Sequence, residues 1–340
     1  NPELGYEEHK ASRWLCEFLS RHGLAVDRGI AGLETSFRAS VAGRVPRPAV
    51  ALLAEYDALP EIGHGCGHNV IGVAACGAAA ALAPIMPELC GSVLVFGCPA
   101  EEGVVDGAGG KVVLVQNGEF DRVDAAMMIH PASRFVVMNS SAARIALTVV
   151  FKGFNPEAAA LLTFNGMNAL RQQFQKGVMV HGILKKASAA AVHGEHAPGS
   201  CEVRVYVRAT DSSLLLEWER KVRDCVRGAG FSSGCEVEMR YTSPTYEELA
   251  TNRALADAFL RNLRYLGATV SEPDDTSVGS TDMGNVSHVV PSLHAFVATC
   301  PRGMAGHTRE FGAATLTREG HNGLLTATKA LAMTTIDLVE

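Results

Sequence analysis

The sequence predicts an α/β domain with a mixed, largely parallel sheet between helices, interrupted by a smaller α+β domain. Two observations predict this fold class. In residues 1–143 and again in 247–340, short runs of Val, Leu and Ala alternate with helical patterns, as in parallel sheets covered on both faces. In residues 144–246 the patterns follow the order β-α-β-β-α-β, which is that of a ferredoxin-like unit. We therefore expect one discontinuous domain, 1–143 and 247–340, and an inserted satellite domain, 144–246.

The elements of the first part follow from local patterns. Residues 5–24 carry apolar side chains at helical spacing and end next to Gly23, which predicts an amphipathic helix. The strand-like runs are SFRASVAG (36–43), AVALLAEYD (49–57), SVLVFGCPAEE (92–102) and DAAMMIHP (124–131). Helices are expected between them, at 70–86 and 108–120. Polar side chains follow several of these strands, where ligands of parallel sheets collect.

The rest of the chain contains the inserted unit, followed by further strands and helices of the α/β domain. The inserted unit has expected strands at 144–151, 178–184, 200–209 and 235–243, and expected helices at 165–176 and 212–230. The second of these helices is stopped by Gly228 and Gly230. After the insertion, a helix at 252–267, a buried strand at 292–300 and a helix at 321–340 complete the α/β domain.

Composition argues against several classes of partner. The 340 residues are 47 % hydrophobic and 19 % charged, which is a globular composition. The net charge of −6 is spread along the chain without a basic block, so neither nucleic acid nor an anionic membrane surface is an expected partner. The apolar runs are too short to span a bilayer, or are broken by Gly and Pro. Nine cysteines without framework spacing predict reduced thiols and a cytoplasmic protein.

Residues 63–70, GHGCGHNV, place a thiol and two imidazoles between glycines. A Cys-x-His loop can present the sulfur of Cys66 and a ring nitrogen of His68 to one metal ion or to a close pair. On its own, such a loop is more often a tight turn with a solvated His and an inert Cys. His64 is better explained as a wall of the loop than as a ligand.

Two adjacent carboxylates, Glu101 and Glu102, follow the strand-like run at 92–97. Neighbouring side chains that leave a strand point in different directions, so one carboxylate can bind a metal while the other faces the substrate. A free carboxylate beside a metal-activated water is a suitable general base. The simpler alternative is a solvated Glu pair at a helix start, where negative charge is favourable.

Two further histidines follow the same pattern. His130 lies at the mouth of a buried strand, and His307 lies in the loop before the last helix. Together with the Cys-x-His loop and one carboxylate, they form a ligand set that suits zinc, manganese or cobalt better than magnesium or calcium. Five ligands and a spare carboxylate are too many for a closed structural zinc site but suit a two-metal hydrolytic site. Asp57 precedes the loop and could orient a ligand His, although a strand-end Asp that caps a turn explains it equally well.

Taken together, these motifs resemble those of a known family. They are similar to the motifs of the aminoacylase and carboxypeptidase family, metallopeptidase family 20, in its amidohydrolase branch. Within that branch the sequence is most similar to the aminoacylase-1-like protein 2 group, which includes β-alanyl-lysine and Xaa-Arg dipeptidases. The resemblance covers nearly the whole chain and rests on NPELGYEEHKAS, LLAEYDALPEIGHGCGHNVIGVAA, PAEEGVVDGAGGK, DAAMMIHP, GSTDMGNVSHVVP and GHTREF.

The resemblance implies a zinc-peptidase-like catalytic domain, a satellite domain used for homodimerisation, and two divalent metal ions, zinc or manganese, with cobalt as a substitute in vitro. The residues that match family ligands are Cys66, His68, Glu102, His130 and His307. Glu101 matches the general base, and we group Asp57 with it as a catalytic residue. Thr281, Asp282 and Asn285 match a loop at the substrate pocket, and His181 is a further expected substrate contact.

The sequence departs from the family at two places. Asn69 stands where many relatives have Asp. In FKGFNPEAAALLTF, residues 151–164, the family usually has a segment whose His stabilises the oxyanion, yet no His occurs between His130 and His181. Either the protein lacks this group or a stretch of about one helix is missing from the printed sequence; the pattern favours the second interpretation, because it resumes in mid-helix.

The sequence therefore predicts hydrolysis of a dipeptide or an N-acyl amino acid. The resemblance suggests a substrate whose C-terminal residue is basic. A non-catalytic relative that binds metabolites or partners on the same scaffold is the main alternative. A thiol hydrolase with Cys66 as nucleophile and His68 as its base is a third, but two neighbours in one loop have poor geometry for this chemistry.

Overall fold

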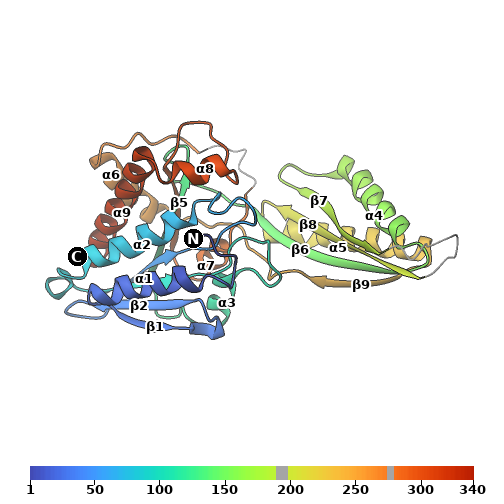
Figure 1. Cartoon of the computed structure of the whole chain (residues 1–340). Coiled ribbons are helices and arrows are strands. Elements are labelled where there is room, and N and C mark those ends of the chain that lie inside the picture. Colours follow the sequence, from blue (N-terminus) through green and yellow to red (C-terminus); the bar gives the residue numbers. More distant parts are fainter. Residues whose placement is uncertain (189–197, 274–278) are drawn as a thin grey trace. The chain divides into compact units, whose positions relative to one another are not determined.

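The computed structural model describes residues 1–188, 198–273 and 279–340 and divides into two compact units (Figure 1). The first comprises Asn1–Ser140, Leu249–Ser277 and Asp282–Glu340, and the second comprises Ser141–Glu248 and Val278–Thr281. The second unit thus includes a short segment that sequence analysis assigned to the first domain. The backbone N–H of Ala142 donates to the carbonyl of Gly279 over 2.8 Å, which joins this segment to the second unit.

The first unit is built on a six-stranded mixed sheet with the order β1-β2-β4-β3-β5-β10. Its strands are β1 (Ala25–Arg28), β2 (Phe37–Ala42), β3 (Ala49–Ala54), β4 (Ser92–Gly97), β5 (Ala125–Ala132) and β10 (Ser292–Ala298). The pairs β4–β3, β3–β5 and β5–β10 are parallel, and the pairs at the β1 end are antiparallel. The predicted mixed, largely parallel sheet is therefore confirmed.

Helices cover this sheet. They are α1 (His9–Arg21), α2 (His68–Leu82), α3 (Gly110–Gln116), α6 (Arg253–Tyr265), α7 (Met283–Ser287), α8 (Arg309–Ala314) and α9 (Arg318–Val339). Helix α2 contacts α1 and α9, α9 contacts α6, and α3 contacts α7. All six residues of β3 are buried, as expected for a central strand whose two faces are both covered.

The sheet topology brings distant segments to one edge. Strands β3, β4 and β5 are neighbours and run parallel, so their carboxyl ends lie together. Ala54 at the end of β3 pairs with Gly97 at the end of β4. The residues that follow these two strands, and His130 within β5, therefore meet although they are far apart in sequence.

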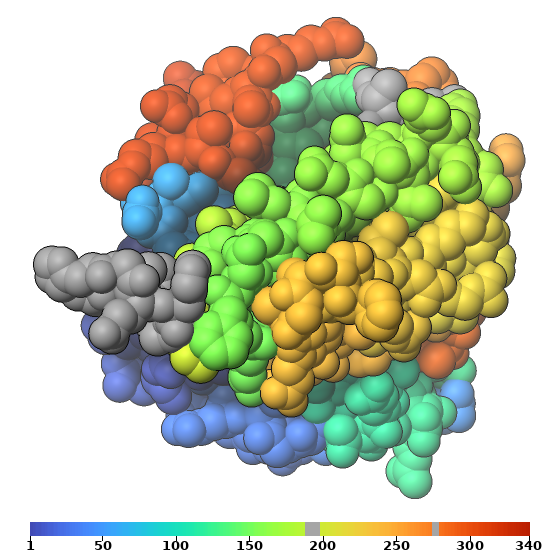
Figure 2. Space-filling view, turned by 90° about the vertical axis from the view of Figure 1, so that its right-hand side faces the viewer, coloured from blue at the N-terminus to red at the C-terminus, as the bar shows by residue number. Residues whose placement is uncertain are grey.

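The second unit is a four-stranded antiparallel sheet with two helices. Its strands are β6 (Ala143–Gly153), β7 (Met179–Ser188), β8 (Gly199–Ala209) and β9 (Glu236–Tyr241), in the order β7-β8-β6-β9. Helices α4 (Pro156–Leu170) and α5 (Ser212–Ser233) contact each other and lie side by side on the face seen in Figure 2. Trp218 of α5 is fully buried in the core between helices and sheet. This is the predicted ferredoxin-like arrangement.

The connection from β6 to α4 contains only Phe154 and Asn155. At the place where the sequence pattern favours a missing stretch, the printed chain passes directly from strand to helix. Helix α4 begins at Pro156, earlier than the predicted 165, because a Pro in the first turn and the Ala-rich residues after it favour a helix start. The printed residues 151–164 contain no His.

No helix in the described ranges is both long enough and apolar enough to cross a membrane. All nine cysteines are free thiols.

Candidate metal centre

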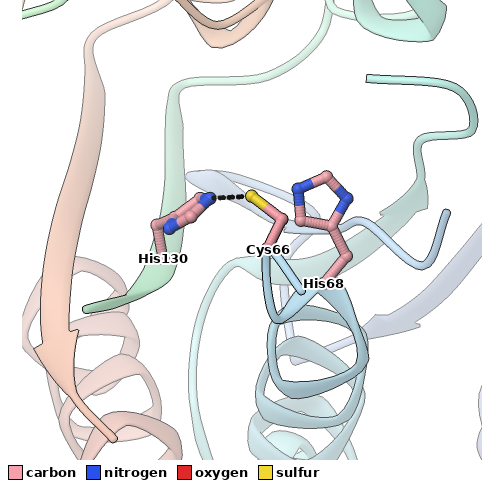
Figure 3. Close-up of side chains that lie close together, drawn as sticks. All are labelled: Cys66, His68 and His130. Carbon is pink, nitrogen blue, oxygen red and sulfur yellow. Dashed lines mark hydrogen bonds between the residues drawn. The ribbon is translucent and has the colours of Figure 1, made fainter. Parts of the chain in front are cut away.

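The five predicted ligands come from four segments around one edge of the first unit's sheet. Cys66 and His68 lie at the start of α2, and Glu102 lies after β4. His130 is in β5, and His307 precedes α8. Figure 3 shows Cys66 and His68 at the end of α2, with the ring of His130 directed toward the sulfur.

His68 is fully buried and is oriented by Asp57. Its Nδ1 donates to Oδ1 of Asp57 over 2.7 Å, which leaves Nε2 as the nitrogen with a free lone pair. Among the described residues, Nε2 has no hydrogen-bond partner. It lies 3.4 Å from Oε2 of Glu55 and 3.9 Å from a carboxylate oxygen of Glu101 and of Glu102. The lone pair and the three carboxylates repel one another, so a cation or a proton must lie between Nε2 and the carboxylate oxygens.

The ring of His130 is also oriented by a hydrogen bond from its Nδ1. Its Nδ1 donates to the carbonyl of Pro131 over 2.9 Å, so its Nε2 carries the lone pair and lies 3.4 Å from Sγ of Cys66. Burial, followed by the positive charge that His68 carries when it is protonated, lowers the pKa of His130 to about 4. The ring is therefore neutral and can act as a ligand at physiological pH.

The donor atoms form two triads that share one sulfur. Cys66, His68 and His130 make the first, and Cys66, Glu102 and His307 make the second; in each, the donor atoms lie within 4.8 Å of one another. Burial raises the pKa of the Cys66 thiol, and binding to a metal ion would offset this. The buried Oε1 of Glu102 also has no hydrogen-bond partner among the residues that the structure describes. These residues would hold two divalent ions, and the sulfur of Cys66 belongs to both triads.

Glu101 lies beside this cluster without belonging to either triad. It forms a further group of close donor atoms with His68 and Glu102. Burial, followed by the negative charges of Glu55, Glu102 and Asp282, raises its pKa well above the usual range for a carboxyl. A carboxylate with this preference for the protonated state is suited to take a proton from a water molecule.

Backbone conformation explains why the loop carries glycine between two ligands. Gly67 has φ +87°, a left-handed conformation that side chains with a Cβ disfavour. A Cβ at this position would also lie 2.5 Å from Cγ of Pro131, the residue after His130. The glycine therefore allows the loop to approach β5 closely enough for Cys66 and His130 to meet.

The sequence that carries these ligands matches a known family. The model of peptidase family M20/M25/M40 matches residues 51–319, which include all five candidate ligands and Glu101. The chain belongs to this family. It is therefore a metal-dependent hydrolase, and the resemblance found in the sequence is confirmed.

Relatives of this M20 chain include named enzymes and solved structures. The Xaa-Arg dipeptidase of Homo sapiens is 35 % identical over 372 residues, covering 99 % of this chain and 83 % of the relative. One of the p-aminobenzoyl-glutamate hydrolase subunits of Escherichia coli is 26 % identical and covers 99 % and 86 % of the two chains. The crystal structure of a dinuclear metal-binding M20 peptidase from Bacillus subtilis has a TM-score of 0.72 at 19 % identity, over 100 % of this chain and 94 % of that one, which shows a shared fold.

The residues predicted to contact substrate are divided between the two units of this M20 chain. His181 is on β7 of the second unit, where its ring stacks on Tyr206 with the centroids 4.8 Å apart. Thr281 is buried and belongs to the same unit. Asn285 lies in α7 of the first unit and is largely buried. Asp282 is fully buried, and both of its carboxylate oxygens bind Lys111 rather than facing solvent.

Sequence reasoning missed several residues of the centre. Glu55, two positions before Asp57, reaches Nε2 of His68, and Lys111 pairs with Glu55 and Asp282. Glu8 accepts a hydrogen bond from the backbone N–H of Ala100, next to Glu101, over 2.8 Å. The available sequence signals were Glu55, directly after the apolar run 49–54, and Lys111, directly after two glycines.

A cavity of about 690 Å³ lies between α1, α2 and the region of α8. Trp14 and Phe18 of α1 and Val73 of α2 make its wall largely apolar. Of the five candidate ligands, only His68 is among the described residues that line it. Among the described candidate ligands, the cavity therefore touches the metal centre only at His68.

Proposed function

We propose that this M20 chain hydrolyses the amide bond of a dipeptide or N-acyl amino acid, with a basic C-terminal residue as the preferred leaving group. The observation that carries the proposal is the pair of ligand triads that share Cys66, with Glu101 beside them. The basic residue is supported by the similarity to the human Xaa-Arg dipeptidase over nearly the whole chain.

The residues have distinct roles in this reaction. Cys66, His68, Glu102, His130 and His307 would hold two divalent ions, which would polarise the scissile carbonyl and lower the pKa of a water molecule. Glu101 takes the proton from the attacking water and delivers it to the leaving amine. Asp57 orients His68. The sulfur, nitrogen and carboxylate donors suit zinc or manganese as the bound metal, with cobalt as a substitute in vitro.

We also propose a homodimer formed through the second unit. β7 is an edge strand of the four-stranded sheet and exposes Ile183, and α4 exposes Leu161. An exposed edge with apolar side chains favours pairing with a second copy. Light scattering of Ile183→Asp tests this: the variant should be a monomer, whereas Ile85→Asp, at an exposed position in the first unit, should not change the mass. The free thiols support a cytoplasmic location.

The main experiment measures hydrolysis of a panel of dipeptides and N-acyl amino acids. Metal-stripped protein should be inactive, and zinc, manganese or cobalt should restore turnover. Glu101→Gln should bind metal with wild-type affinity and lose at least about a hundredfold in kcat, because it cannot accept a proton. Glu88→Gln, at an exposed position, is the matched control. Activity that survives complete chelation would contradict the proposal and favour thiol chemistry at Cys66.

A non-catalytic relative is the second candidate function. The absence of any His between His130 and His181 favours it, because the family usually places an oxyanion-stabilising His in that interval. Metal binding without turnover on any substrate of the panel would support this alternative. In that case Glu101→Gln would change no measured property.

A further inference from the structure

Next to the two triads lies a third group of close carboxylates. Glu55, Glu101 and Asp282 each offer an oxygen, and these three oxygens lie within 4.8 Å of one another. Glu55 and Asp282 are fully buried. Three carboxylates at this distance in a buried site repel one another strongly, and such a group normally holds a cation.

The ammonium group of Lys111 binds two of these three carboxylates. Its Nζ donates to Oε1 of Glu55 and, over 2.5 Å, to Oδ1 of Asp282. The backbone N–H of Lys111 donates to the other oxygen of Asp282 over 2.9 Å. The side chain of Lys111 is fully buried. Two carboxylates, one after the end of β3 and one at the start of α7, are thus neutralised by one residue of α3.

Backbone contacts join the segment before Lys111 to the segment before Glu101. Helix α3 starts at Gly110, where a Cβ would lie 2.1 Å from the carbonyl oxygen of Pro99, so only glycine allows this approach. The backbone N–H of Gly109 donates to the carbonyl of Ala100 over 2.7 Å. The segment that leads into Lys111 is therefore bound directly to the segment that leads into Glu101.

Glu55 lies close to the metal centre, so the neutralisation of its charge by Lys111 matters for ion binding there. Oε2 of Glu55 lies 3.4 Å from Nε2 of His68, so this carboxylate is near enough to compete for an ion at the first triad. Its other oxygen is bound by Lys111. Releasing Glu55 from Lys111 would leave a carboxylate free to take part in ion binding.

We propose that Lys111 is a positioning residue whose ammonium group occupies a third cation site, made by Glu55, Glu101 and Asp282, and so limits the centre to two metal ions. The inference rests on the proposed metal centre but concerns a separate group of ligands. Replacing the ammonium with an uncharged side chain of similar length should open this site to one additional divalent ion.

Metal content after equilibrium dialysis against zinc or manganese tests the proposal on the full chain. Lys111→Met should bind one ion more per chain than the wild type does. The double variant Lys111→Met/Glu55→Gln should lose this extra ion, because it removes a carboxylate of the third site. Lys152→Met, at an exposed lysine of the second unit, should match the wild type. A folded Lys111→Met protein with the wild-type number of ions would overturn the proposal.

Thermal unfolding in the absence of metal covers the case in which Lys111→Met folds poorly. If Lys111 acts by charge compensation, Lys111→Met/Glu55→Gln should have a higher Tm than Lys111→Met, since it relieves repulsion. A double variant no more stable than the single one would overturn the inference. A wild-type protein that binds no metal would instead reject the proposed function. The difference in ion number between Lys111→Met and the wild type would still test whether Lys111 occupies a cation site.

Discussion

Nδ1 of His68 donates to one oxygen of the Asp57 carboxylate over 2.7 Å, and the other oxygen of that carboxylate accepts the backbone N–H of Glu102 over 2.9 Å. One buried carboxylate thus orients a candidate ligand at the start of α2 and the backbone of another after β4. The two triads, which contain His68 and Glu102 respectively, are linked through this residue. A defect at Asp57 should therefore affect both ions.

We expect Asp57→Asn to weaken metal binding by about 10- to 100-fold, as is usual when an outer partner of a ligand is changed. Asn offers one oxygen acceptor, so it can accept from His68 or from Glu102 but not from both. Competition with a chromogenic chelator measures the affinity. Asp121→Asn, at an exposed position, serves as the control. Equal affinities for Asp57→Asn and the wild type would show that Asp57 does not orient the ligands.

We expect Cys66→Ser to remove both ions, because its sulfur belongs to both triads and a hydroxyl is a poorer ligand for zinc or manganese. His307→Gln changes only the second triad and should retain about one ion per chain. Elemental analysis of dialysed protein gives the number of ions. If Cys66→Ser kept one ion at wild-type affinity, the sulfur could not be shared.

We expect Gly67→Ala to lower the free energy of unfolding by more than the roughly 1–2 kcal/mol that the left-handed backbone alone costs. Its new Cβ would meet Pro131 at 2.5 Å and displace the loop that holds Cys66 and His68. Gly267→Ala is a matched control, since Gly267 has φ +80° but no atom within 4 Å of an added Cβ. Urea unfolding should show the larger loss at Gly67. Equal losses would mean that the contact with Pro131 relaxes without cost.

We expect stability to depend on pH through Glu8. Its buried carboxyl accepts hydrogen bonds from Thr35 and from the backbone of Ala100, both over 2.8 Å. Burial, followed by the charge of Asp57, raises the pKa of Glu8 from 4.5 to about 7. Between these values the folded protein holds a proton that the unfolded chain has released. The free energy of unfolding should therefore fall as pH rises through this interval, by about 3 kcal/mol.

Thermal unfolding measured across this pH range, with and without Glu8→Gln, tests the assignment. The variant should lack the decrease that the wild type shows, because its amide does not titrate. Glu7→Gln, at the exposed neighbouring position, should keep it. A wild-type profile that rises with pH over this window would contradict the raised pKa of Glu8.

Local patterns in the sequence were sufficient for the fold class. Runs of Val, Leu and Ala and helical spacing depend on neighbours within a few residues, so they predicted most strands and helices and the insertion of an α+β unit. The motifs around Cys66, Glu101 and His307 were specific enough to indicate the family. Local patterns did not predict the start of α4 at Pro156, because helical spacing is clear only over 165–176 and the Ala-rich turn before it departs from the family pattern.

Contacts between distant segments depended on the tertiary structure. Lys111 and Asp282 are 171 positions apart, and Glu55 and Lys111 are 56 apart; no local period carries information about such pairs. The sharing of Cys66 by two triads likewise results from the order of β3, β4 and β5 in the sheet. Residue types and spacing therefore determined which chemistry was available. Only the packing of the sheet and helices decided which carboxylates face the candidate metal ions and which one is neutralised by a buried lysine.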